Sequence, residues 1–413
     1  GKYLVNIYNN FSIPFTLINL SIVLLIFVVM RQLINIAEVL ETEKTRLGIA
    51  KKLSIKIFKN IMLSKSEFIR GIKQGKFTAL CETECHRTSA LYKATLQFIS
   101  ASIQIGAYAV VMFYVAPLMT ALAIFIILLL IISMYSFVKK SHIAGSMVVS
   151  IRQKLYNFIS ENFSLWRLFK FTGSIKNELV KINILADDYA KKQLAIIKYS
   201  SISRFIIAVV AMFLCVLFLN LSVNFFNFDF AKITLFSLIF IRLIPLGQRI
   251  NGLINSLAAQ FPSLFLVSKM LYDSNNNKEE LNKGKNFEVN NNIIEFKDVF
   301  FSYNIYKKKV ILNNINLTIP ANKITAIVGR SGSGKSTLID LLPRIISPNS
   351  GSIYIDGVNI EDFALSTLRK NISFVSQDTI LFDGSIQENI SYYYPKATYS
   401  EIKEASILSG AEE

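Results

Sequence analysis

The sequence predicts two parts of different fold class, an all-helical membrane domain followed by an α/β domain. Three observations support this division. The first 272 residues contain long runs without a charged side chain, residues 273–292 change abruptly to an Asn- and Lys-rich composition, and the residues after them alternate short β-type and helical segments. We therefore assign residues 1–272 to a transmembrane domain, residues 273–292 to a linker and residues 293–413 to an α/β domain.

The composition excludes several classes of protein. Hydrophobic residues make up 52% of the 413 residues and charged residues only 18%, against about 25% charged in soluble proteins. The 32 Phe and 17 Tyr exclude a disordered chain, and three cysteines are too few for a disulfide scaffold.

Five membrane spans are predicted, at residues 11–35, 95–116, 118–138, 203–224 and 232–254. About 20 apolar residues cross a hydrocarbon core of about 30 Å, and the uncharged run Ala94–Val138 is too long for a single crossing. We expect it to reverse at Pro117, which breaks a helix. The last span is the weakest because Arg242 and Arg249 interrupt it.

The positive charge of the chain is concentrated between the spans. Lys and Arg number 45 against 28 Asp and Glu, a formal charge of +17, and many of them fall in residues 31–93 and 139–204. By the positive-inside rule these two long segments face the cytoplasm. Their charge is thereby explained without a nucleic-acid partner, and none is expected. Both segments have apolar residues at helical spacing, so we expect helices that extend beyond the membrane and reverse near residues 64–75 and 162–173.

A phosphate-binding motif lies in the α/β domain. The apolar run Lys323–Val328 is expected to be a buried strand, and a helical segment follows the motif. Between them the spacing Gly-x4-Gly-Lys-Ser is that of a P-loop, in which glycines let backbone N–H groups approach phosphate oxygens. The predicted cofactor-binding residues are Gly329, Arg330, Ser331, Gly332, Ser333, Gly334, Lys335, Ser336 and Thr337. Lys335 would contact the β- and γ-phosphates, and the Ser336 hydroxyl would ligate Mg²⁺.

The residues around the P-loop decide among the many P-loop classes. The segments FKDVFFSY, VILNNINLTIPANKITAIVGRSGSGKST, GSIYIDGVNI and FVSQDTILFDGSIQENI are similar to those of the ATP-binding cassette (ABC) transporters of the exporter type. The resemblance extends over essentially the whole chain and is most specific from Ile293 onward. It implies an all-α polytopic membrane domain, with five of an expected six spans present, followed by a partial α/β P-loop nucleotide-binding domain.

The resemblance also implies roles for single residues. Tyr303 corresponds to the aromatic residue that stacks on adenine. Gln377 corresponds to the Q-loop residue, which acts in catalysis by contacting Mg²⁺ or the attacking water; Ser336 and Gln377 are thus the expected metal-binding residues, and ATP and Mg²⁺ the expected cofactors. The tips of the two cytoplasmic helix pairs, near residues 64–70 and 161–167, would be coupling helices that contact nucleotide-binding domains.

The function implied by the resemblance is ATP-driven export of a substrate across the membrane by alternating access. The chain would be one half-transporter, multi-pass in a bacterial plasma membrane with its nucleotide-binding domain cytoplasmic, and ATP would be hydrolysed at an interface shared with a second half-transporter, identical or different. The absence of an initiating Met at Gly1, and an end at Glu413 before any signature loop, Walker B aspartate or catalytic glutamate, predict a fragment truncated at both ends.

Two questions stay open from the sequence. A catalytically inactive nucleotide-binding subunit of a heterodimeric transporter is the alternative function. The transported substrate is unknown; Arg242 inside the last span is hypothesised to line the translocation path and to favour an anionic or amphipathic substrate, against the simpler interpretation of an arginine that extends to the inner membrane surface.

Overall fold

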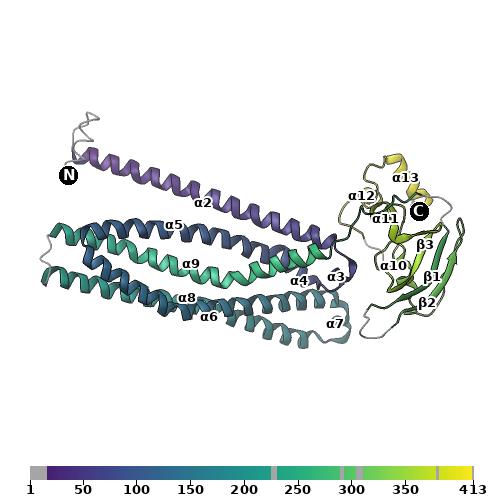
Figure 1. Ribbon diagram of the computed structural model, residues 1–413, viewed down its shortest axis with the longest axis horizontal. Coiled ribbons are helices and arrows are strands. Elements are labelled where there is room, and N and C mark those ends of the chain that lie inside the picture. Colours follow the sequence, from purple (N-terminus) through teal and green to yellow (C-terminus); the bar gives the residue numbers. More distant parts are fainter. Residues whose placement is uncertain (1–15, 225–229, 289–292, 304–309, 378–380, 412–413) are drawn as a thin grey trace. The chain divides into compact units, whose positions relative to one another are not determined.

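The computed structural model describes residues 16–224, 230–288, 293–303, 310–377 and 381–411. The chain divides into two compact units, residues 1–279 and 280–413. The division falls inside the linker predicted at 273–292, of which residues 289–292 lie outside the described residues. The first unit is helical and the second contains the sheet (Figure 1).

Long helices make up the first unit. They are α2 (Leu17–Met62), α5 (Cys85–Val115), α6 (Pro117–Ser164), α8 (Ile175–Asn224) and α9 (Phe230–Asn276), with the shorter α3 (Ser66–Arg70), α4 (Gln74–Ala79) and α7 (Trp166–Thr172) and one π-helical turn at Leu80–Glu84. Each predicted span falls on one of the long helices, although residues 11–15 of the first lie outside the described residues. Among described residues, four helices are long and apolar enough to cross a membrane, at 17–62, 74–115, 175–221 and 233–276.

The helix boundaries follow from local sequence. The reversal expected at Pro117 occurs there: Ala116 leaves the helical conformation, with φ −148° and ψ 79°, and Pro117 begins α6, where a missing N–H costs nothing. Gly173 ends α7 in the left-handed region at φ +65°. The chain reverses near residues 64–75 and 162–173 as expected, and the short helices α3 and α7 lie in these two reversals. Helix α7 begins at Trp166, five residues after the start of the coupling helix expected near residues 161–167.

The long helices pack along their length. Helix α5 lies against α9, and α6 lies against both α8 and α9 (Figure 1). At one crossing Gly145 of α6 meets the backbone of α9 so closely that an added Cβ would lie 2.4 Å from the carbonyl oxygen of Ala259. Two buried apolar clusters hold the unit: one contains Met112, Ala116, Leu214, Phe218, Phe236 and Ile239, the other Ile57, Ile61, Leu80, Cys85, Val267 and Met270.

Helices α8 and α9 differ in their backbone. No proline interrupts α8, whereas Pro245 and Pro262 lie inside α9, and each removes one backbone hydrogen bond from that helix. Helix α9 continues to Asn276, so the first four residues of the predicted linker are helical.

The second unit is built on an antiparallel sheet. Its strands β1 (Ile294–Phe301), β2 (Leu312–Ile319), β3 (Ser350–Ile355) and β4 (Val358–Asn359) lie in the order β2-β1-β3-β4. Helix α10 (Lys335–Leu341) follows the P-loop, and α11 (Leu365–Lys370), α12 (Ile386–Ile390) and α13 (Tyr399–Leu408) complete the unit. The core packs Phe296, Val299 and Ile353 of the sheet against Leu338, Leu341 and Leu368 of the helices. Asp356 and Gly357, both at positive φ, form the tight turn between β3 and β4.

The prediction of a buried strand at Lys323–Val328 was wrong for the described chain. Residues 323–330 pair with no strand among the described residues, and Ile324 and Val328 are fully or almost fully exposed. A strand needs a hydrogen-bonded neighbour on at least one edge, and the four described strands pair with one another and not with this segment.

Candidate functional site

The P-loop folds as a compact loop in front of α10. Lys335, the first residue of α10, turns back over the loop, and its Nζ donates hydrogen bonds to the carbonyl oxygens of Gly329 at 2.8 Å and Arg330 at 2.9 Å. The Ser333 N–H donates to the carbonyl of Arg330 at 3.1 Å, and the helix continues with Leu338 N–H donating to Gly334. The predicted phosphate-binding residues from 329 to 337 are therefore brought together, with a cation at their centre.

Two glycines of the loop adopt conformations that other residues rarely adopt. Gly332 has φ +80° and Gly334 φ +95°. A Cβ on Gly334 would also lie 2.9 Å from the side chain of Leu312 and 3.1 Å from that of Ile311, so β2 and the residue before it leave no room for a larger residue. Glycine is required at position 334 for both conformational and steric reasons.

Tyr303 lies beside this loop. Its hydroxyl and the hydroxyl of Thr337 are 3.2 Å apart, and its ring packs edge-to-face on Phe301 with centroids 4.8 Å apart. The side chain is half exposed, at 50%. The adenine-stacking residue predicted from the sequence is thus held next to α10 by two contacts.

Gln377 has no hydrogen bond to the P-loop among the described residues. It lies exposed in a bend beside residues 378–380, which fall outside the described residues. Within the described chain no hydrogen bond joins its side chain to Lys335 or Ser336.

The donors present suit a nucleoside triphosphate with its magnesium ion. The loop offers backbone N–H groups, with open space beside Gly332, one ammonium and the hydroxyl of Ser336, a hard oxygen ligand of the kind that Mg²⁺ accepts. In the parts of the chain that the structure describes, no three His, Cys, Asp or Glu side chains converge as a metal site of their own.

Comparison with known families decides the identity. The family model described as "ABC transporter transmembrane region" matches residues 2–244, more than half of the chain, and the model described as "ABC transporter" matches residues 312–412. This chain belongs to the ABC transporter family. A transmembrane region and an ATP-binding region on one polypeptide are the arrangement of an exporter half-transporter, as the sequence predicted, and the helical unit followed by a sheet-containing unit agrees with it.

Relatives of this ABC transporter chain include proteins of bacteria. The "Heterocyst differentiation ATP-binding protein HepA" of Nostoc sp. is 28% identical over 408 residues, which cover 95% of this chain and 64% of HepA. An "ATP-dependent lipid A-core flippase" of Haemophilus influenzae is 34% identical over 217 residues, covering 52% of this chain and 37% of the flippase. The chain thus spans less than two thirds of the length of these relatives.

A solved structure shares the fold. The structure described as "a bacterial Atm1-family ABC exporter with ATP bound" superposes with a TM-score of 0.81 at 18% identity, covering 98% of this chain and 72% of that one. The likeness confirms the exporter fold predicted from the sequence.

Proposed function

We propose that the second unit binds MgATP in its P-loop and that the complete protein uses ATP to drive export of a substrate by alternating access. One observation carries the proposal. The ammonium of Lys335 lies within hydrogen-bonding distance of two carbonyl groups of a loop in which Gly332 and Gly334 adopt positive φ and Gly332 has open space beside it. The ammonium is thereby held at the loop, from which it can turn to phosphate oxygens, while backbone N–H groups of such a loop bind the anion.

Each residue has a defined task in this proposal. Lys335 exchanges its carbonyl partners for β- and γ-phosphate oxygens, the backbone N–H groups of residues 330–337 donate to the phosphates, and the Ser336 hydroxyl holds Mg²⁺. Tyr303 stacks on the adenine ring. Gln377 reaches Mg²⁺ and the attacking water after a movement of its segment. Mg²⁺, when bound, neutralises the charge that develops on the phosphates.

Turnover requires a second half-transporter in this proposal. ATP is bound between the P-loop of one subunit and the signature loop of its partner, closure of the dimer moves the coupling helices α3 and α7, and hydrolysis resets the cavity. In this proposal the protein spans the bacterial plasma membrane and its second unit lies in the cytoplasm. The alternative, a catalytically inactive subunit of a heterodimer, binds ATP in the same way; phosphate release by the complete protein, measured with and without a partner chain, separates the two.

The P-loop assignment is tested by measuring ATP affinity. Lys335→Ala removes a charge-assisted hydrogen bond, a contact that contributes about 1.5–3 kcal/mol, so we expect ATP to bind at least about tenfold more weakly. Lys370→Ala removes an exposed lysine from the end of α11 in the same unit and serves as the matched control. Equal ATP affinity in the two variants would falsify the assignment.

The substrate path is tested separately. Arg242 lies exposed on α9, and we propose that it faces the translocation path and favours anionic or amphipathic substrates. Transport by the Arg242→Ala protein that equals the unchanged protein for every substrate would refute this role.

A further inference from the structure

Helix α9 has a break in its backbone hydrogen bonding at Pro262. In an α-helix each N–H donates to the carbonyl four residues earlier, so a proline at position 262 leaves the carbonyl of Ala258 without its donor within the helix. Pro245 leaves the carbonyl of Ile241 without its donor in the same way. Both prolines are therefore points at which α9 can bend, and they differ in what surrounds the freed carbonyl.

The carbonyl of Ala258 has a donor from another helix. Nδ1 of His142, on α6, lies 3.1 Å from this oxygen. Because a carbonyl oxygen only accepts, Nδ1 carries the proton and donates it. The imidazole also lies at a tilt beside the ring of Phe261, the residue before the proline, with ring centroids 6.3 Å apart. Two separate contacts thus hold His142 at the break.

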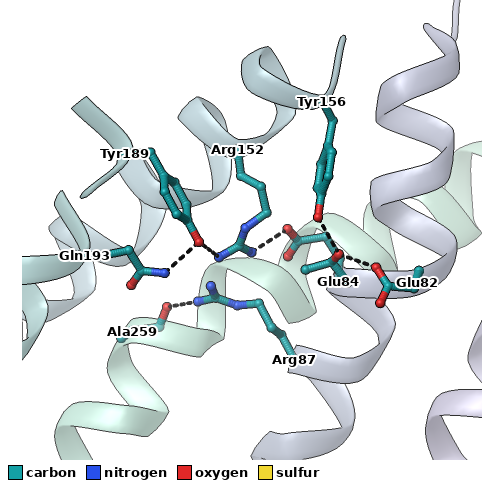
Figure 2. Close-up of polar contacts among 9 residues, drawn as sticks. Glu82, Glu84, Arg87, Arg152, Tyr156, Tyr189, Gln193 and Ala259 are labelled. Carbon is teal, nitrogen blue, oxygen red and sulfur yellow. Dashed lines mark hydrogen bonds and ion pairs between the residues drawn. The ribbon is translucent and has the colours of Figure 1, made fainter. Parts of the chain in front are cut away.

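The next carbonyl along α9 has a donor from a third helix. Nη2 of Arg87, on α5, donates to the carbonyl of Ala259 at 3.0 Å (Figure 2). A hydrogen bond from an ionised donor is stronger than one between neutral groups. Two successive carbonyl groups in the turn before Pro262 are therefore bonded to side chains of two neighbouring helices, one on α6 and one on α5.

The backbone of α6 approaches the same turn. Gly145 follows His142 by three residues and so lies on the same face of α6. A Cβ added to Gly145 would lie 2.8 Å from the Cα of Ala259, so this position has room for glycine alone. The close approach of the two backbones keeps His142 within reach of the freed carbonyl.

The surroundings of Pro245 are different. Ile241, whose carbonyl that proline frees, is 58% exposed. Within the described chain no side chain of another helix donates a hydrogen bond to this carbonyl. A proline in α9 is therefore not sufficient to gather donors from the helices around it, and the pair of donors at Pro262 is particular to that break.

The segment of α9 after the break is the part that would move. It contains the 14 residues after Pro262, which form about 21 Å of helix, and the chain continues from it into the linker. Val267 and Met270 of this segment pack in one apolar cluster with Ile57 and Ile61 of α2. A change of direction at Pro262 therefore moves both the start of the linker and the part of α2 that packs on α9.

We propose that Pro262 is a hinge of α9 and that His142 and Arg87 form the clamp that holds it. With both hydrogen bonds made, α9 keeps one direction through the break; when either bond is released, the segment after Pro262 swings relative to α6. His142 and Arg87 are positioning residues, because they act through the backbone of α9. The use of this movement in the export cycle rests on the proposed function, whereas the hinge and its clamp do not.

The swing is measured by pulsed electron paramagnetic resonance, as the distance between spin labels at Lys154 of α6 and Tyr272 of α9, both exposed. The labels are carried on non-natural amino acids, so that the native cysteines stay in place, and the complete protein is held in lipid nanodiscs without nucleotide. Tyr272 lies about 15 Å of helix beyond the hinge, so a swing of about 20° moves it by about 5 Å.

The variants separate a hinge clamp from an ordinary packing contact. His142→Ala and Arg87→Gln should each shift or broaden the distance distribution by about 5 Å. His86→Ala removes the other histidine of the chain, which is exposed on α5, and should leave the distribution unchanged. Pro262→Ala gives the carbonyl of Ala258 its donor within α9 again, so His142→Ala should then have no effect, whereas it should keep its effect alongside Pro245→Ala.

The proposal is overturned by an unchanged distribution in His142→Ala or in a folded Arg87→Gln protein, or by an equal change in His86→Ala. It is also overturned if the effect of His142→Ala persists after Pro262→Ala or is lost after Pro245→Ala. His142 is exposed, so its variant is expected to fold even where that of Arg87 does not. Because no nucleotide is added, these outcomes leave the MgATP proposal untouched, and a loss of ATP binding leaves the hinge untouched.

Discussion

Replacing Glu84 by leucine leaves the Arg152 guanidinium buried without its carboxylate, and we expect a large loss of stability in the helical unit. The side chain of Glu84 is fully buried and that of Arg152 is 8% exposed, with the two joined at 3.1 Å. Removing one partner of a buried ion pair costs about 3–5 kcal/mol, because the remaining charge keeps its desolvation penalty. Arg152 retains a hydrogen bond to the hydroxyl of Tyr189, so we expect the lower end, about 3 kcal/mol.

The assay is the free energy of unfolding in detergent micelles titrated with sodium dodecyl sulfate, with helix content followed by circular dichroism. Glu41→Leu is the control, because the Glu41–Lys44 pair is exposed and such pairs contribute at most about 1 kcal/mol. The double variant Glu84→Leu/Arg152→Met should recover most of the loss, since hydrophobic replacement of a buried pair is often neutral. A cost for Glu84→Leu no larger than that for Glu41→Leu would refute the reasoning.

Three further predictions concern two glycines and the glutamate that caps helix α12. Gly145→Val should lower the melting temperature of the helical unit, because its Cβ would lie 2.4 Å from the carbonyl oxygen of Ala259, whereas Gly252→Ala, with nothing within 4 Å, should not. Gly334→Val should weaken ATP at least about tenfold in the binding assay, since φ +95° is closed to valine; unchanged affinity would contradict the loop geometry. Ser385 caps the start of α12, and its backbone N–H and hydroxyl donate to the Glu388 carboxylate. These hydrogen bonds lower the pKa of Glu388, so the stability that its carboxylate adds to the helix is present above the ordinary Glu pKa and is lost as the pH falls through the lowered value. Amide protection in α12 should fall as the pH drops below the ordinary range of a Glu carboxyl, and Glu388→Gln should remove this dependence.

Local patterns account for what could be predicted from the sequence. Uncharged runs of bilayer length predict helices irrespective of their neighbours, and Pro117 and Gly173 end helices through backbone constraints of their own. The hydrogen bonds of Lys335 and Ser333 within the P-loop are equally local, because both partners of each fall within nine residues of chain. Lys335 reaches the carbonyl groups of the loop because its position at the start of a helix leaves its side chain within reach of the preceding turn.

Contacts between distant residues could not be predicted in this way. Glu84 and Arg152 are 68 residues apart in sequence, and nothing in either local pattern distinguishes them from the many surface charges around them. The strand predicted at Lys323–Val328 was wrong because the preference for β structure is local, whereas pairing depends on a neighbouring strand that no local pattern specifies. The burial of Glu84 depends on how the helices around it pack, and its local sequence does not indicate it.

The presence of prolines in α9 and their absence from α8 have a mechanical consequence. Helix α8 contains 50 residues, which gives a rod about 75 Å long, and about 30 Å of it suffices to cross a bilayer. The remaining length of about 45 Å acts as a lever arm, so a tilt of about 10° within the membrane displaces its far end by about 8 Å. Helix α9 carries two prolines and can absorb a similar tilt by bending at them. Helix α8 therefore transmits a tilt to its far end, whereas the adjacent α9 takes up the tilt by bending at its prolines.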